Sequence, residues 1–98
     1  MAEVKHSKNF VATGTTDACV FEAGPFNLSI WLTSDPTASI ADTTVHLERS
    51  FDSGTTWLRV EKFEDTAVEK LIDNVEDDTQ WRCNVTEYTA GITIRMGQ

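Results

Sequence analysis

Apolar and polar residues alternate along much of the chain with a period of two. Every second residue from Phe26 to Leu32 is large and apolar, and most of the residues between them are polar. The alternation returns in Thr79–Tyr88 and in Ile92–Met96. Because successive side chains of a β-strand point to opposite faces of a sheet, the pattern predicts strands with one buried and one exposed face.

The strongest turn signal lies between two further β-type runs, in Val45–Val60. The Asp52 carboxylate can accept backbone N–H groups and Gly54 can adopt a positive φ, so we expect a hairpin with a type I turn and a bulge. The spacing Ser-x-Asp-x-Gly-x-Thr-Trp resembles the Asp-box of sialidases and other secreted β proteins. That resemblance implies an architectural role only, in which Ser50, Asp52 and Gly54 set the turn and Trp57 packs beneath it.

One segment, Asp65–Val75, fits two structures. Its residues Val68, Leu71, Ile72 and Val75 have helical spacing, but the segment is short, lacks a strong stop signal and lies among strands. We predict a strand or an extended connection here.

The whole pattern predicts seven or eight short strands separated by turns in a single domain over residues 9–98. Two sheets that each hide one face against the other give an all-β, antiparallel β-sandwich, either immunoglobulin-like or jelly-roll. The first strand is expected in Asn9–Thr13. Residues Met1–Lys8 are polar and show no period, so they are expected to form a mobile N-terminal arm or a segment that becomes ordered only against a partner.

Charge and hydropathy exclude several partners. Sixteen acidic against eight basic residues give a net charge of −8, and eight of the carboxylates fall between Glu61 and Asp78. We therefore expect no nucleic acid and no membrane as a partner. The chain shows no apolar stretch of membrane-spanning length and no apolar signal core at its start, which predicts a protein made in a cytoplasm and not secreted.

Cys19 and Cys83 are then expected to be reduced core thiols, with a bridge between them as the alternative.

Motifs that would carry catalysis are missing from the sequence. His6 and His46 have no partner that the sequence identifies, and there is no phosphate-binding loop, nucleophile elbow or zinc-type spacing. We predict no enzyme, no cofactor and no metal site. The candidate contact residues are instead the basic Lys5, His6 and Lys8 and the aromatic Trp31 and Tyr88. Trp31 lies on a nominally exposed strand face, either as a covered rim residue or as a contact for another subunit or ligand.

Four ordered motifs give the chain a family resemblance. They are FNLSIW at Phe26–Trp31, the LERSFDSGTTW hairpin at Leu47–Trp57, a closing Trp-Arg strand at Trp81–Arg82 and Tyr-Thr-Ala-Gly at Tyr88–Gly91. This order resembles a group of small virion proteins of tailed bacteriophages, over about three quarters of the chain.

The resemblance implies a virion structural protein that binds other virion proteins of the capsid or tail and forms a homo-oligomer. A capsid decoration or head-fibre component is the first hypothesis, and a tail or neck accessory protein is the second. A third hypothesis, from another class, is a carbohydrate-binding module that uses Trp31 and Tyr88 as stacking platforms.

Overall fold

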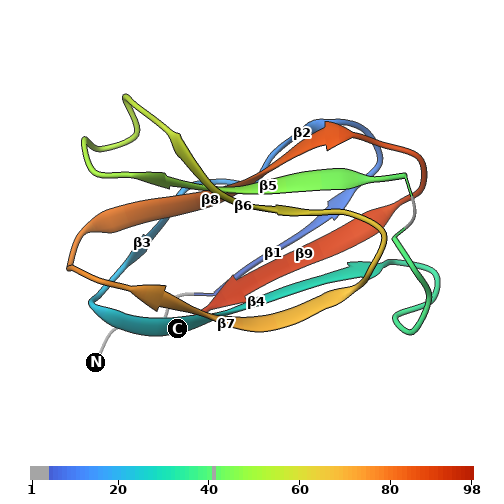
Figure 1. Cartoon of the computed structure of the whole chain (residues 1–98), viewed down its shortest axis with the longest axis horizontal. Helices are drawn as coiled ribbons and strands as arrows, with labels where there is room; N and C mark the ends of the chain where they lie inside the picture. Colours follow the sequence, from blue (N-terminus) through green and yellow to red (C-terminus); the bar gives the residue numbers. More distant parts are fainter. Residues whose placement is uncertain (1–4, 41) are drawn as a thin grey trace.

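The structure is a computed structural model that describes residues 5–40 and 42–98, and the described residues form nine β-strands (Figure 1). The strands are β1 (Lys5–Phe10), β2 (Gly14–Thr15), β3 (Cys19–Phe21), β4 (Gly24–Leu32), β5 (Thr44–Ser50), β6 (Leu58–Phe63), β7 (Val68–Asn74), β8 (Thr79–Glu87) and β9 (Ile92–Gly97). No helix capable of crossing a membrane occurs among these residues. The all-β class predicted from the alternation is confirmed.

Two antiparallel sheets pack face to face, as the two layers of Figure 1 show. Sheet A has the strand order β1-β9-β4-β7, and sheet B has the order β2-β8-β5-β6, with β3 pairing with the same strand β8 as β2. Except for β2–β3 and the β5–β6 hairpin, every connection crosses from one sheet to the other. This connectivity is that of a jelly roll, whereas immunoglobulin-like sheets contain further hairpins of consecutive strands.

The core lies between the sheets and is filled by the inward residues of the alternating strands. The predicted inward side chains are buried in β8, where Trp81 is only 1% exposed, and in β4 from Phe26 to Ile30, whereas Leu32 at the end of β4 is half-buried. The Phe26 ring centroid lies 4.4 Å from that of Phe21 and 4.9 Å from that of Trp81, so aromatic rings from both sheets meet at one end of the core. The alternation therefore correctly predicts which side chains of both sheets face the core.

The first strand differs from the prediction. Residues 5–8, expected in a mobile arm, belong to β1, which runs beside β9 from Lys5 opposite Gly97 to Phe10 opposite Ile92. Residues 1–4 of the predicted arm lie outside the described residues. As an edge strand, β1 is held by backbone hydrogen bonds to β9 on one side only, and Phe10 is its only large apolar residue. Hydrophobic alternation therefore could not detect it.

The ambiguous segment is a strand. Strand β7 pairs with β4 in unbroken register from Val68 opposite Ile30 to Asn74 opposite Gly24. Its outward Leu71 is 69% exposed, whereas its inward neighbour Ile72 is buried. The helical spacing of the apolar residues is thus coincidental, because two of the four, Leu71 and Val75, are exposed to solvent.

A buried amide at the end of β7 joins the two sheets. Asn74 is 1% exposed, and its Nδ2 donates to the backbone oxygens of Phe21 at 3.2 Å and Glu22 at 2.7 Å. Its Oδ1 accepts a hydrogen bond from Trp81 Nε1 at 3.1 Å. This role of Asn74 was not identified from the sequence.

Both cysteines are free and buried in sheet B, as predicted. Burial, with a smaller contribution from the charge of Asp17, raises the pKa of Cys19 to about 12. Burial likewise raises the pKa of Cys83. These thiols therefore behave as small apolar core residues at neutral pH.

Candidate functional site

The β5–β6 loop is held by its own side chains. Ser50 Oγ accepts the backbone N–H of Gly54 at 2.9 Å and donates to Asp52 Oδ1 at 2.8 Å. Asp52 Oδ1 also accepts the backbone N–H of Thr56 at 2.7 Å. Trp57 Nε1 donates to the Gly54 carbonyl at 3.0 Å, and Gly54 has a φ of +88°. The four residues of the Asp-box-like motif thus stabilise a turn.

This turn makes the stability of the protein depend on pH. Hydrogen bonds from Thr56 and then Ser50 lower the pKa of Asp52 from 3.8 to about 2. Because the unfolded chain binds this proton at higher pH than the folded chain, the stabilisation is present above pH 4 and is lost as the pH falls toward 2. We expect Asp52→Asn to flatten this part of the profile, measured by urea denaturation between pH 2 and pH 5. Parallel profiles for the variant and the wild type would contradict the assignment.

On the outer face of sheet B beside this loop, charged and aromatic side chains contact one another. The Arg82 guanidinium lies 4.2 Å from the Trp57 ring centroid, and Arg82 Nε donates to Glu48 Oε1 at 2.7 Å. Arg59 Nε is 3.5 Å from the other oxygen of Glu48, which is 4% exposed. Burial raises the pKa of Glu48, but hydrogen bonds from Arg82 and Asn84 outweigh it, so this pKa lies below its usual value. The negative charge of Glu48 is therefore compensated within the chain by two arginines.

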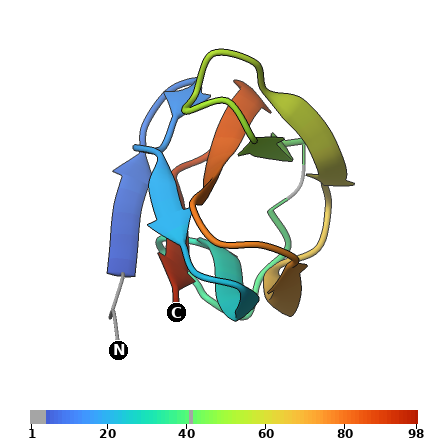
Figure 2. The same cartoon turned by 90° about the vertical axis from the view of Figure 1, so that its left-hand side faces the viewer.

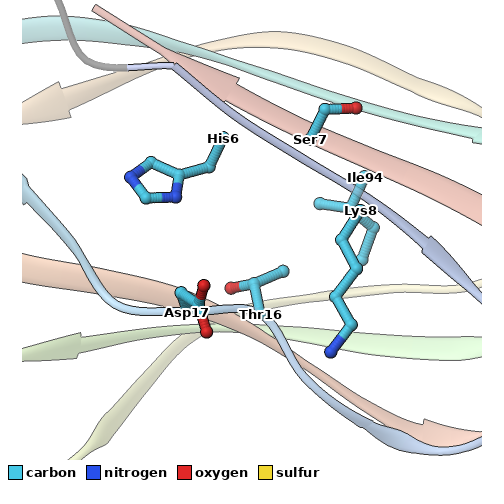
Figure 3. Close-up of a pocket in the computed structure, with 6 residues that line it drawn as sticks. All are labelled: His6, Ser7, Lys8, Thr16, Asp17 and Ile94. Carbon is cyan, nitrogen blue, oxygen red and sulfur yellow. The ribbon is translucent and has the colours of Figure 1, made fainter.

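A polar cavity of about 240 Å³ opens between β1 and the β2–β3 segment of sheet B (Figure 3). His6 and Lys8 line it from β1, and Thr16 and Asp17 line it from the other sheet. Lys8 Nζ donates to the backbone oxygen of Thr15 at 3.1 Å. Two of the basic residues predicted as contacts therefore share one edge of the sandwich. The Lys5 side chain is not among the described parts of the structure.

The two aromatic candidates do not form one site. Trp31 is half-buried on the outer face of sheet A, next to a cavity of about 210 Å³ lined also by Pro36, Val68 and Glu69. Tyr88 is 37% exposed and lies in the connection between β8 and β9, outside that lining. As stacking platforms for a carbohydrate, the two rings would therefore act separately.

Beside Trp31, sheet A carries a hydrogen-bonded network that sequence reasoning missed. Ser29 Oγ donates to Glu69 Oε2 at 2.6 Å, and Asn27 Nδ2 donates to the other carboxylate oxygen. Arg95 donates to Asn27 Oδ1 at 3.2 Å. Alternation placed Asn27 and Ser29 on the same face as Trp31, but only the pairing of β4 with β7 and β9 brings Glu69 and Arg95 to them.

Comparison with solved structures finds a similar fold. The chain is similar to the crystal structure of the Yersinia pseudotuberculosis-derived mitogen, with a TM-score of 0.53 and 12% sequence identity. The alignment covers 97% of this chain and 84% of the mitogen chain. No protein-family model and no curated protein matches the sequence. At 12% identity the likeness shows a shared β-rich fold and assigns no activity.

The described residues contain no group of three or more His, Cys, Asp or Glu side chains that could hold a metal ion. The surface features that remain are the free edges of the two sheets and the outer face of sheet A.

Proposed function

We propose that the protein is a structural subunit of a bacteriophage particle, assembled in multiple copies as a capsid decoration or head-fibre component. The ordered motifs that resemble virion proteins support this class. Jelly rolls also recur in viral capsid domains, although a fold by itself does not assign a function. The observation that carries the proposal is the pair of free strand edges at the two sides of sheet A.

These edges are oriented for head-to-tail contact. Strand β1 forms one edge of sheet A and β7 the other, on opposite sides of the sandwich in Figure 2. Each neighbouring pair in the order β1-β9-β4-β7 is antiparallel, so β1 also runs antiparallel to β7. A second copy placed beside the first therefore brings its β1 antiparallel to the first copy's β7, which continues the sheet. Repeating this heterologous contact builds a ring or a filament.

The edges of sheet A are more suitable for pairing than the β6 edge of sheet B. Strand β7 pairs with β4, and β1 with β9, without a shift of register. The β5–β6 pairing instead contains a bulge between Leu47 and Glu48. Bulges bend an edge and hinder its pairing with another chain. The proposed contact therefore uses β1 and β7.

The two edges differ in charge. On β7, the exposed Leu71 lies between the outward acidic residues Glu69 and Asp73. On the opposite edge, β1 presents Ser7 on this outer face, whereas His6 and the exposed Lys8 point to the other face of the sheet, toward Thr15 and Thr16. A long free edge with an exposed apolar residue is a typical site of strand pairing. Because these basic side chains and the acidic side chains of β7 lie on opposite faces, they form no ion pairs across the contact. Only their longer-range attraction would guide the encounter, and added salt would weaken it.

Strand β1 takes the role that the sequence analysis gave to a mobile arm. Deleting residues 1–8 would remove the pairing of residues 5–8 with β9, so that deletion would test folding as well as assembly. Single substitutions at exposed edge positions separate the two effects.

We expect Leu71→Ser and Lys8→Glu each to lower the assembled fraction in sedimentation velocity at about 0.15 M salt. The thermal unfolding midpoint should stay near that of the wild type, because both side chains are exposed. The matched controls are Val11→Ser, which changes an 81% exposed residue outside the edge, and Lys62→Glu on β6. Both controls should assemble like the wild type.

A wild-type protein that stays monomeric at all accessible concentrations, or edge variants that assemble like their controls, would contradict the proposal. The alternative function, as a tail or neck accessory protein, is distinguished from a shell component by the number of copies in a purified particle. A shell component is present in many copies and a neck component in few.

A further inference from the structure

The outer face of sheet A lies outside the proposed edge contacts and carries many hydrogen-bonding side chains. Across the sheet, Ser7, Arg95, Ser29 and Glu69 lie in one register row. A second row places Trp31 opposite Thr93, which is paired in turn with Asn9 on β1. Hydrogen-bonding side chains of four strands thus surround one large aromatic residue.

The polar groups beside Trp31 are fixed by one another. Glu69 accepts from Ser29 and Asn27, and Asn27 in turn accepts from Arg95. The Arg95 side chain lies over Gly97, where an added Cβ would come within 3.2 Å of the guanidinium. On the other side of Trp31, Thr93 Oγ1 is 2.8 Å from both Asn9 Oδ1 and Thr33 Oγ1. Such mutual bonds hold donors and acceptors in place before a ligand arrives.

Trp31 supplies an apolar surface next to this network. The 210 Å³ cavity beside it has Pro36 and Ala67 in its lining, and Glu69 lines the same cavity. One small space therefore offers an aromatic ring, aliphatic walls and a fixed carboxylate. Sites for small polar ligands combine an apolar lining with a few oriented polar groups in this way.

We propose that this face binds a neutral carbohydrate, with a sugar ring at Trp31 and its hydroxyl groups at the Glu69–Asn27–Arg95 network. A pyranose ring has C–H groups that pack on an aromatic face, and hydroxyls at its rim that both donate and accept hydrogen bonds. The face supplies the matching partners, since Glu69 accepts, Arg95 donates and Asn27 can do both. The contact uses Trp31 alone as its platform, without Tyr88.

Charge distinguishes a neutral sugar from a cationic ligand. A quaternary ammonium group also binds against Trp, but its sites present aromatic faces around an uncompensated charge. Here Arg95 lies in the same register row as Glu69 and offsets its charge. A ligand that carries many hydroxyls and no net charge fits this balance better.

The test is a titration of ¹⁵N-labelled full-length protein with linear oligosaccharides of glucose, mannose, galactose and N-acetylglucosamine. At least one should shift the Trp31 Nε1–H resonance and neighbouring β4 and β9 amides in a saturable way. Trp31→Ala and Glu69→Gln should each weaken binding at least about tenfold, whereas Tyr88→Ala should bind like the wild type. Amide spectra of the free variants check that each one is folded.

Three results would overturn the carbohydrate site. In the first, no oligosaccharide of the panel moves the Trp31 resonance. In the second, choline or a trimethyl-lysine peptide shifts it in place of the sugars. In the third, folded Trp31→Ala and Glu69→Gln bind the sugar as tightly as the wild type. The assembly proposal is unaffected by each, because its contact lies on the edges of sheet A.

Discussion

Replacing Asn74 by Ala is expected to lower the free energy of unfolding by about 2–4 kcal/mol, one of the two largest effects we predict. The amide accepts from Trp81 Nε1 and donates to the carbonyls of Phe21 and Glu22. Its removal leaves the indole N–H without this partner in a core position that is 1% exposed. A buried polar group without a partner costs about 1–3 kcal/mol.

The matched control for this prediction is Asn84→Ala. Asn84 also carries a side-chain amide, but it lies half-buried on the outer face of β8 with a 3.4 Å hydrogen bond to Glu48. Equilibrium denaturation in urea should show a clearly smaller loss for this variant. Equal losses in the two variants would mean that Asn74 does not join the sheets.

Gly54→Val is the second large effect, with an expected loss of about 2–3 kcal/mol. Gly54 has a φ of +88°, which a β-branched residue adopts only under strain. An added Cβ would also lie 3.0 Å from Gln80 Oε1 and 3.6 Å from the Trp57 ring. The Gln80 side chain can move, so backbone strain accounts for most of the loss.

Thr55→Val provides the control for Gly54→Val, because it introduces the same residue one position later in the same loop. Thr55 is exposed and already β-branched, so we expect its replacement to change the stability by less than about 0.5 kcal/mol. Urea denaturation of the two variants side by side is the measurement. If Gly54→Val is as stable as Thr55→Val, the turn does not depend on the glycine.

The hairpin and the main core strands could be predicted because their signals are local. Ser50, Asp52 and Gly54 lie within five residues of one another and bond to one another, so their spacing alone describes the turn. The alternation in Phe26–Leu32 likewise records which side of a single strand is buried. Neither signal needs knowledge of a partner strand.

The sheet order and the candidate sites could not be predicted, because they depend on pairings between distant segments. Strand β1 pairs with β9 across almost the whole chain. Glu69 reaches Ser29 only because β7 pairs with β4. Asn74 resembles a loop residue in the sequence, and its role as a link between sheets appears only when Trp81 and Phe21 lie beside it. Local periodicity carries no information about such neighbours.

The contact between β1 and β7 can be tested directly by cross-linking. The double variant Ser7→Cys with Leu71→Cys places one exposed thiol on each edge strand, while Cys19 and Cys83 stay buried. A short, flexible bis-maleimide tolerates a register shift of one residue pair. We predict a ladder of covalent oligomers for the double variant, and only dimers for an equal mixture of the two single variants. Monomers in the double variant, or dimers from either single variant alone, would contradict head-to-tail assembly through sheet A.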